Sequence, residues 1–163
     1  MLFHLPTIIT VMIDITVWFA IHMGVSYIMT RMPAHSFNPD SWLYRTRNWE
    51  RNGKIYHKIF RLKLWKKKLP DGAALFRNGF EKKHIEKTNE AYFDTFIRET
   101  CRGELTHWIV FLFGPIFFIW NLWWVGIIMI IYALAANMPC IITQRYNRIR
   151  FIKVIRARIS PSI

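Results

Sequence analysis

The sequence predicts an all-α integral membrane protein, with about three transmembrane helices and amphipathic interfacial helices on the cytosolic side. Hydrophobic residues make up 53% of its 163 residues and charged residues only 20%, yet the formal net charge is +13. An average soluble domain is about 25% charged and closer to neutral, so this chain is both more apolar and more basic. No Lys or Arg precedes Arg31 and none lies between Arg102 and Arg145, and these two intervals are also the apolar ones. Apolar and basic segments therefore alternate along the chain.

Other protein classes fit this composition poorly. A disordered chain is poor in apolar residues, and a disulfide scaffold needs more cysteines than Cys101 and Cys140. A nucleic-acid-binding protein could carry this charge, but its basic residues would not need to avoid two long apolar intervals. We therefore expect no nucleic-acid partner.

The first apolar interval predicts one membrane span and the second predicts two. Residues 5–29 are long enough to cross a bilayer, since about 20 apolar helical residues at ~1.5 Å rise each span its core. In the second interval Gly114 and Pro115 introduce a bend, and a turn near Asn121 would separate spans 105–120 and 122–143. The span 105–120 is short, so it either crosses fully or is re-entrant.

The positive charge fixes the expected orientation. The loop 31–104 holds 17 Lys and Arg residues and the tail 145–163 holds the other six. Because positively charged loops stay in the cytosol, both segments should be cytosolic, with the N-terminus and the Asn121 turn outside. Residues 1–163 then form a single multi-pass membrane domain. Asp14, inside the first span, is expected to make a structural polar contact with the bundle interior.

Three segments are typical of helices that lie on an anionic membrane surface. In residues 54–68, about 81–102 and 147–159, apolar rows are interleaved with lysine and arginine or lie beside them. Such helices bury their apolar rows in the interface while their cations reach the lipid headgroups. Binding of headgroup or cofactor phosphates by the same cations is the alternative.

Glu104 and His107 are candidate catalytic residues. They stand three residues apart and hence on one helical face, at the start of the second apolar interval. A carboxylate that orients an imidazole suits general-base chemistry, because it favours the imidazolium that forms as a hydroxyl proton is taken. The alternative is that Glu104 caps the helix or reaches the interface while His107 anchors at headgroup depth. We expect no metal site, since Cys101, Glu104 and His107 diverge around a single helix.

The end of the third span is rich in polar side chains. Asn137, a candidate substrate-binding residue, lies near Pro139, whose ring removes a helical hydrogen bond and leaves a carbonyl to be satisfied. Beyond it come Gln144, Arg145, Asn147 and Arg148, and the arginines are candidates for a phosphate or carboxylate clamp. Plain anchoring in the cytosol would also explain the arginines. Arg31 lies just after the first span, so we expect it at the same membrane depth.

A series of motifs between about residues 29 and 151 resembles the glycosyl-4,4'-diaponeurosporenoate acyltransferase family of bacterial membrane proteins. These motifs are Thr30-Arg31-Met32-Pro33 with Phe37; Trp49-Glu50, Gly53-Lys54 and Tyr56; Trp65-Lys66 and Leu69-Pro70-Asp71-Gly72; Glu99-Thr100, Arg102, Glu104-Leu105 and His107-Trp108; Ala136-Asn137 with Pro139; and Gln144-Arg145-Tyr146-Asn147-Arg148 with Arg150. The first span shows no distinctive match. The resemblance implies transfer of a fatty acyl group to a sugar hydroxyl of a membrane glycolipid, of which a glycosylated carotenoid is one.

For such a transfer we expect a direct mechanism with a role for each candidate residue. His107, held by Glu104, would deprotonate the acceptor hydroxyl. Arg145, Arg148 and Arg31 would hold donor phosphate or stabilise the oxyanion, and Gln144 or Asn147 would bind the sugar. No bound cofactor is expected, since the acyl donor is a co-substrate: a thioester of coenzyme A, an acyl carrier protein or a phospholipid. The alternative function is a non-catalytic membrane subunit or scaffold that binds anionic lipid or a partner enzyme.

Overall fold

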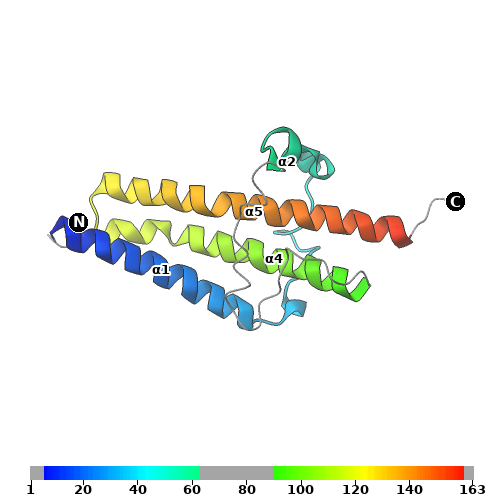
Figure 1. Cartoon of the computed structure of the whole chain (residues 1–163), viewed down its shortest axis with the longest axis horizontal. Helices are drawn as coiled ribbons and strands as arrows, with labels where there is room; N and C mark the ends of the chain where they lie inside the picture. The colour runs from blue at the N-terminus through cyan, green and yellow to red at the C-terminus, as the bar shows by residue number, and fades with distance from the viewer. Residues whose placement is uncertain (1–5, 63–89, 160–163) are drawn as a thin grey trace.

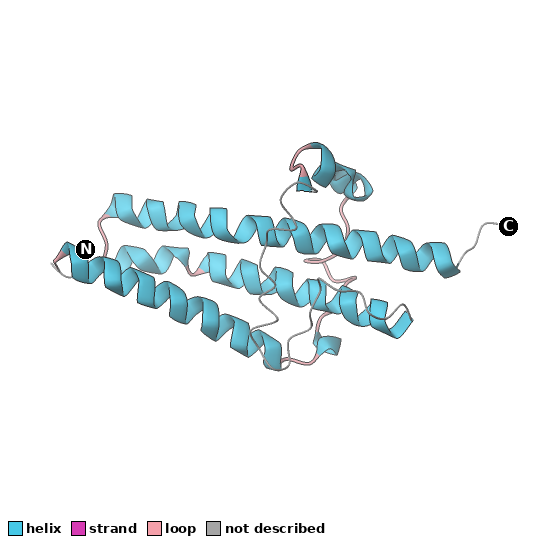
Figure 2. Cartoon of the chain, viewed as in Figure 1, coloured by secondary structure: helices cyan, strands magenta, loops and turns pink. Residues whose placement is uncertain are grey.

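The computed structural model describes residues 6–62 and 90–159, and all regular secondary structure in these residues is helical (Figure 2). Within these described residues, four α-helices and three 3₁₀ helices follow one another. They are α1 (Thr7–Arg31), η1 (Ala34–Ser36), η2 (Asn48–Gly53), α2 (Lys54–Lys58), α4 (Glu90–Leu112), η5 (Gly114–Ile119) and α5 (Trp123–Ile159).

The three long helices form a layer in which α4 lies between α1 and α5 (Figure 1). The chain enters α5 from α4 through η5 and a short turn at Asn121, so α4 and α5 are antiparallel neighbours. Both helices continue past the end of α1 at Arg31, and the short α2 lies beside the middle of α5 (Figure 1). The predicted all-helical fold and the predicted turn near Asn121 are therefore confirmed.

Two helices, rather than the expected three, are long and apolar enough to cross a membrane in the described part of the chain. They are α1 and the portion Trp123–Ala157 of α5. The predicted span 105–120 is not one helix, because α4 ends at Leu112 and the chain continues as the 3₁₀ helix η5. Pro115 has no backbone N–H to continue the α-helical hydrogen bonding, which accounts for the break.

The structure does not confirm that the three amphipathic segments are separate helices lying on a membrane surface. The apolar rows of α4 and of the C-terminal half of α5 pack on each other, and the ring centroids of Phe96 and Phe151 lie 4.1 Å apart. Phe93 and Ile97 complete this cluster, so protein covers side chains that were expected to face lipid. Of the predicted helix 54–68, the structure contains α2; the lysines at 66–68 lie outside the described residues. The tail is not a separate helix either, since α5 runs continuously through Pro139.

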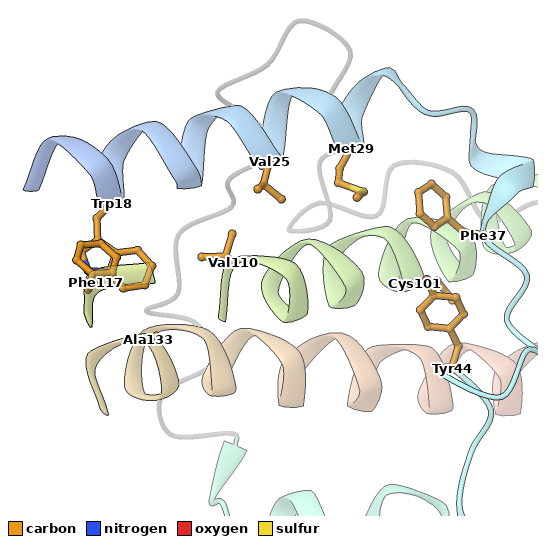
Figure 3. Packing of buried hydrophobic residues seen from close by; sticks show 9 residues of the cluster. All are labelled: Trp18, Val25, Met29, Phe37, Tyr44, Cys101, Val110, Phe117 and Ala133. Carbon is orange, nitrogen blue, oxygen red and sulfur yellow. The ribbon is translucent and has the colours of Figure 1, made fainter. Parts of the chain in front are cut away.

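A hydrophobic core joins α1 to α4, η5 and α5. Trp18, Val25 and Met29 of α1 point toward the other two long helices, and Trp18 stacks on Phe117 at a centroid distance of 4.5 Å (Figure 3). Such a stack adds about 0.5–1.5 kcal/mol to the free energy gained by burial alone. The core therefore holds α1 against the bend that replaces the predicted second span.

Asp14 makes the expected polar contact with the bundle. Its Oδ1 accepts hydrogen bonds from Trp120 Nε1 at 2.7 Å and from Asn121 Nδ2 at 2.8 Å. Since a buried carboxylate requires such partners, this contact fixes the turn between η5 and α5 against α1.

The outer surface of α1 and of the first half of α5 is apolar. Exposed large side chains line both helices: Ile8, Met12, Ile15 and Phe19 on α1, and Trp123, Ile128 and Ile131 on α5. A soluble monomer rarely exposes so continuous an apolar surface. The two apolar helices and this surface support a membrane location.

Gly126 provides a test of the packing between η5 and α5. A Cβ at this position would lie 2.5 Å from ring atoms of Phe118, whereas one at Gly24 of α1 would meet nothing within 4 Å. We expect Gly126→Ala to lower the free energy of unfolding by about 1–3 kcal/mol through overpacking. Gly24→Ala should be neutral or slightly stabilising, because Ala favours helix over Gly by roughly 0.5–1 kcal/mol. Thermal unfolding in detergent, followed by circular dichroism, measures the difference, and equal melting temperatures would contradict this packing.

Candidate functional site

A buried carboxylate, Glu104 of α4, lies at the centre of the candidate site. Its Oε1 accepts a hydrogen bond from Arg145 Nη1 at 2.7 Å, and its Oε2 accepts one from Arg148 Nη2. Trp108 Nε1 lies 3.4 Å from Oε1. Arg145 and Arg148 are three residues apart on α5, which places both on the side that faces α4. The structure thus joins three of the predicted site residues in one ion-pair cluster.

A second buried carboxylate, Glu50 of η2, completes this cluster. Arg145 binds both of its oxygens, with Nε 3.0 Å from Oε1 and Nη2 3.2 Å from Oε2. The Tyr56 hydroxyl and the backbone N–H of Arg47 also donate to it. Burial would raise the pKa of Glu50, but these hydrogen bonds hold the pKa below its usual value, so the side chain stays ionised. Sequence reasoning gave Glu50 no role, although it belongs to a motif that carries the family resemblance.

Every N–H donor of Arg145 is used within the protein. A guanidinium has five such donors. Two go to Glu50 and one to Glu104, while the carbonyl oxygens of Leu43 and Arg45 accept the others at 3.1 and 3.2 Å. Arg145 therefore holds the segment 43–50 against α4 and α5, and in this arrangement it has no donor left for a substrate.

Arg148 differs from Arg145 in this respect. Its Nε donates to the carbonyl of Tyr44 and its Nη2 to Glu104, but its buried Nη1 has no hydrogen-bond partner in the described part of the chain. Gln144 Oε1, one helical turn away, is likewise buried without a partner. A buried polar atom left unsatisfied costs about 1–3 kcal/mol, so the pair is a candidate for contact with a bound molecule.

His107 is oriented by Asn137 of α5. The two side chains meet with Nδ1 of the histidine 2.9 Å from Oδ1 of the asparagine, while Asn137 Nδ2 donates to the carbonyl of Ala133 at 2.8 Å. The second bond fixes the amide with its oxygen toward the imidazole. Because this oxygen can only accept, Nδ1 must carry the hydrogen, and Nε2 is the basic nitrogen of the neutral ring. The expected orienting partner was Glu104, but the structure gives the Nδ1 contact to Asn137.

The remaining predicted residues have other environments. Arg31 is exposed at the end of α1, with its guanidinium 5.0 Å from the Tyr27 ring centroid. Asn147 is buried on α5. Burial raises the pKa of the Cys101 thiol to about 11, which disfavours the thiolate that a nucleophile requires. Among the residues that the structure describes, no three His, Cys, Asp or Glu side chains are grouped to hold a metal ion.

The ion-pair cluster predicts a large difference between two carboxylate-to-amide substitutions. Glu104→Gln places an amide N–H₂ against arginine donors inside the protein, and breaking a buried pair in this way costs about 3–5 kcal/mol. Asp94→Asn removes an exposed pair with Arg98 on the same helix, which contributes only about 0.3–0.5 kcal/mol. Thermal unfolding of both variants tests the cluster. A Glu104→Gln variant as stable as Asp94→Asn would show that Glu104 is not held as described.

Comparison with known proteins agrees with the resemblance found in the sequence. The family model for glycosyl-4,4'-diaponeurosporenoate acyltransferase matches residues 39–157. Proteins of that name from Staphylococcus aureus strains bovine RF122 / ET3-1 and MRSA252 are each 36% identical over 145 residues, covering 85% of this chain and 84% of the relative. No solved structure matches the chain. The predicted family is therefore confirmed: this chain is an acyltransferase that belongs to the glycosyl-4,4'-diaponeurosporenoate acyltransferase family.

Proposed function

We propose that this acyltransferase moves a fatty acyl group onto a sugar hydroxyl of a membrane glycolipid, with a glycosylated carotenoid as the acceptor. The names of the relatives supply the acceptor class. The apolar outer surface of α1 and α5 supports an acceptor that resides in the bilayer. The observation that carries the proposal is the orientation of His107 by Asn137. Arg148 Nη1 and Gln144 Oε1, which have no hydrogen-bond partner among the described residues, belong to the same pair of helices.

In this proposal His107 is the general base. Its Nε2 takes the proton of the acceptor hydroxyl while the hydroxyl oxygen attacks the carbonyl carbon of the activated acyl group. Asn137 keeps its hydrogen bond to Nδ1–H before and after the ring is protonated, so the imidazole does not turn during the reaction. The imidazolium then returns the proton to the leaving group of the donor, and the products are the acylated sugar and the free donor group. The donor is a co-substrate: a thioester of coenzyme A, an acyl carrier protein or a phospholipid.

Arg148 and Gln144 bind the reacting groups. Arg148 Nη1 donates to the carbonyl oxygen, whose negative charge grows in the transition state, and a donor already in place there needs no reorganisation. Gln144 Oε1 accepts a hydrogen bond from a sugar hydroxyl. Glu104 acts through Arg148, because the carboxylate binds Nη2 of the guanidinium and leaves Nη1 for the substrate. Asn147 as a sugar ligand and Arg31 as a ligand for donor phosphate stay predictions.

The chemistry takes place at the cytosolic boundary of the cell membrane. Helix α5 has 37 residues, about 55 Å at ~1.5 Å per residue, whereas the hydrocarbon core is only about 30 Å thick. Residues 122–143 suffice to cross it, so Gln144 and the helix beyond lie on the other side. The excess of Lys and Arg in the tail and in the loop 31–104 supports a cytosolic location for that side.

Substitution of His107 separates a general base from an interfacial anchor. His107→Gln keeps size and polarity but cannot take a proton, so we expect the transfer rate to fall roughly 10²–10⁴-fold. His22→Gln is the matched control, because His22 lies on α1 with its ring centroid 5.8 Å from that of Trp18 and is not part of the proposed site. Transfer of labelled acyl groups to a glycosylated carotenoid, by membranes with equal amounts of each variant, is the measurement. Wild-type transfer by His107→Gln would rule out the general-base assignment.

A further inference from the structure

Residues 42–61, which include η2 and α2, form a small lobe beside α5 (Figure 1). It is packed on α5, where Tyr56 and the adjacent Leu62 form a buried cluster with Ile149. Glu50 binds Arg145, and Lys153 Nζ donates to the carbonyl of Asn52. The lobe is therefore held rigidly against the helix that carries the candidate site.

The lobe exposes large apolar side chains. Trp42 is 70% exposed, Trp49 56% and Ile59 63%, and Phe60 is also exposed. These residues are not isolated, since the Arg47 guanidinium lies 4.9 Å from the ring centroid of Trp42, and Trp49 contacts Tyr56 edge-on at 6.5 Å. Aromatic side chains with this exposure are typical of surfaces that enter the interfacial region of a bilayer.

The exposed charge of the lobe has a single sign. Its one acidic residue is Glu50, which is buried and neutralised by Arg145. Five of its basic residues are exposed: Arg45, Arg51, Lys54, Lys58 and Arg61. A surface with such cations and with exposed tryptophan and isoleucine fits an anionic lipid layer. The cations can bind the lipid phosphates, and the apolar side chains can enter the boundary of the hydrocarbon region.

The backbone keeps this surface in a defined shape. Arg51, Asn52 and Gly53 follow one another with φ of +45°, +56° and +87°, a left-handed turn that non-glycine residues rarely adopt. A Cβ at Gly53 would be 3.4 Å from Ile149, so the turn also approaches α5 closely. The lobe thus presents its cations and tryptophans from a fixed turn rather than from a regular amphipathic helix.

We propose that the lobe 42–61 docks on the anionic headgroups of the cytosolic leaflet, with Trp42, Trp49 and Ile59 in the interface. This inference rests on the proposed topology, in which Arg145 and the lobe bound to it lie just beyond the span 122–143. An acidic protein would satisfy the cations but would not account for the exposed tryptophans. Docking would also bring the membrane surface close to the candidate site. The lobe is linked to that site through Arg145, which pairs with both Glu50 of the lobe and Glu104.

Fluorescence in lipid nanodiscs tests the docking surface with the full chain. In a Cys140→Ser background, a fluorophore is attached at Asn48→Cys, next to Trp49, or at Ala157→Cys near the far end of α5. Both positions are exposed, and the remaining native thiol, Cys101, is buried. We expect nitroxide-labelled lipid to quench position 48 severalfold more than position 157 in discs that contain phosphatidylglycerol. Lys54→Gln combined with Lys58→Gln, or high salt, should reduce this quenching.

Three results would overturn the inference. They are equal quenching at the two positions, quenching that does not depend on lipid charge, and protection of position 48 only when an acidic acyl carrier protein is added. Because the readout is lipid contact and not acyl transfer, its failure leaves the proposed reaction intact. Loss of transfer in His107→Gln with unchanged quenching would, conversely, separate the catalytic site from the docking surface.

Discussion

The buried ion pairs of Glu50 and Glu104 with Arg145 and Arg148 are the interaction on which the rest of the structure depends. The four charges sum to zero, so the cluster can be buried where any single member could not. Its members come from η2, α4 and α5, and Arg145 lies 95 residues from Glu50 in sequence. Arginine supplies five donors in a fixed plane, which lets one side chain bind two carboxylates and two backbone carbonyls together. A lysine could not replace it.

The same cluster determines which arginine is available for chemistry. Arg145 is saturated by the protein, whereas Arg148, held at Nε and Nη2, retains a buried Nη1 without a partner in the described residues. About three helical turns before Arg148 on α5, Asn137 sets the tautomer of His107. A general base and a fixed donor for the carbonyl oxygen are the two groups that direct acyl transfer to a hydroxyl requires. In the proposed mechanism, the ion pairs would contribute to catalysis by restraining Arg148 rather than by touching the substrate.

The sequence predicted those features that depend on local composition. The distribution of Lys and Arg located α1 and the apolar half of α5, and Asn121 marked the turn between η5 and α5. Helical periodicity showed that the segments 81–102 and 147–159 have apolar faces, but periodicity cannot say whether lipid or protein covers a face. Here Phe96 and Phe151 cover each other. The span 105–120 was expected from length and hydropathy, which do not register that Pro115 ends the α-helical pattern.

The sequence also predicted the candidate site only in part. Spacing on one helix made Glu104 and His107 candidates, and the polar end of the third span added Asn137, Gln144 and Arg148. Which of these residues pair with one another depends on how α4 and α5 pack in antiparallel, which no local pattern contains. Glu50 was missed because its partners are distant in sequence and its loop lacks a regular helical pattern.

Comparison of Arg145→Lys with Arg148→Lys tests the central claim most directly. Stability is measured by thermal unfolding, and kcat by acyl transfer at saturating acceptor and donor. Arg145→Lys loses most of five hydrogen bonds that join η2, α4 and α5, so it should melt at the lower temperature of the two. Arg148→Lys keeps a cation beside Glu104 but loses Nη1, so it should retain more of the fold while kcat falls by about 10²–10³-fold, as expected for a lost oxyanion donor. The reverse pattern, a stable Arg145→Lys with impaired chemistry and an unstable Arg148→Lys with normal kcat, would contradict the account.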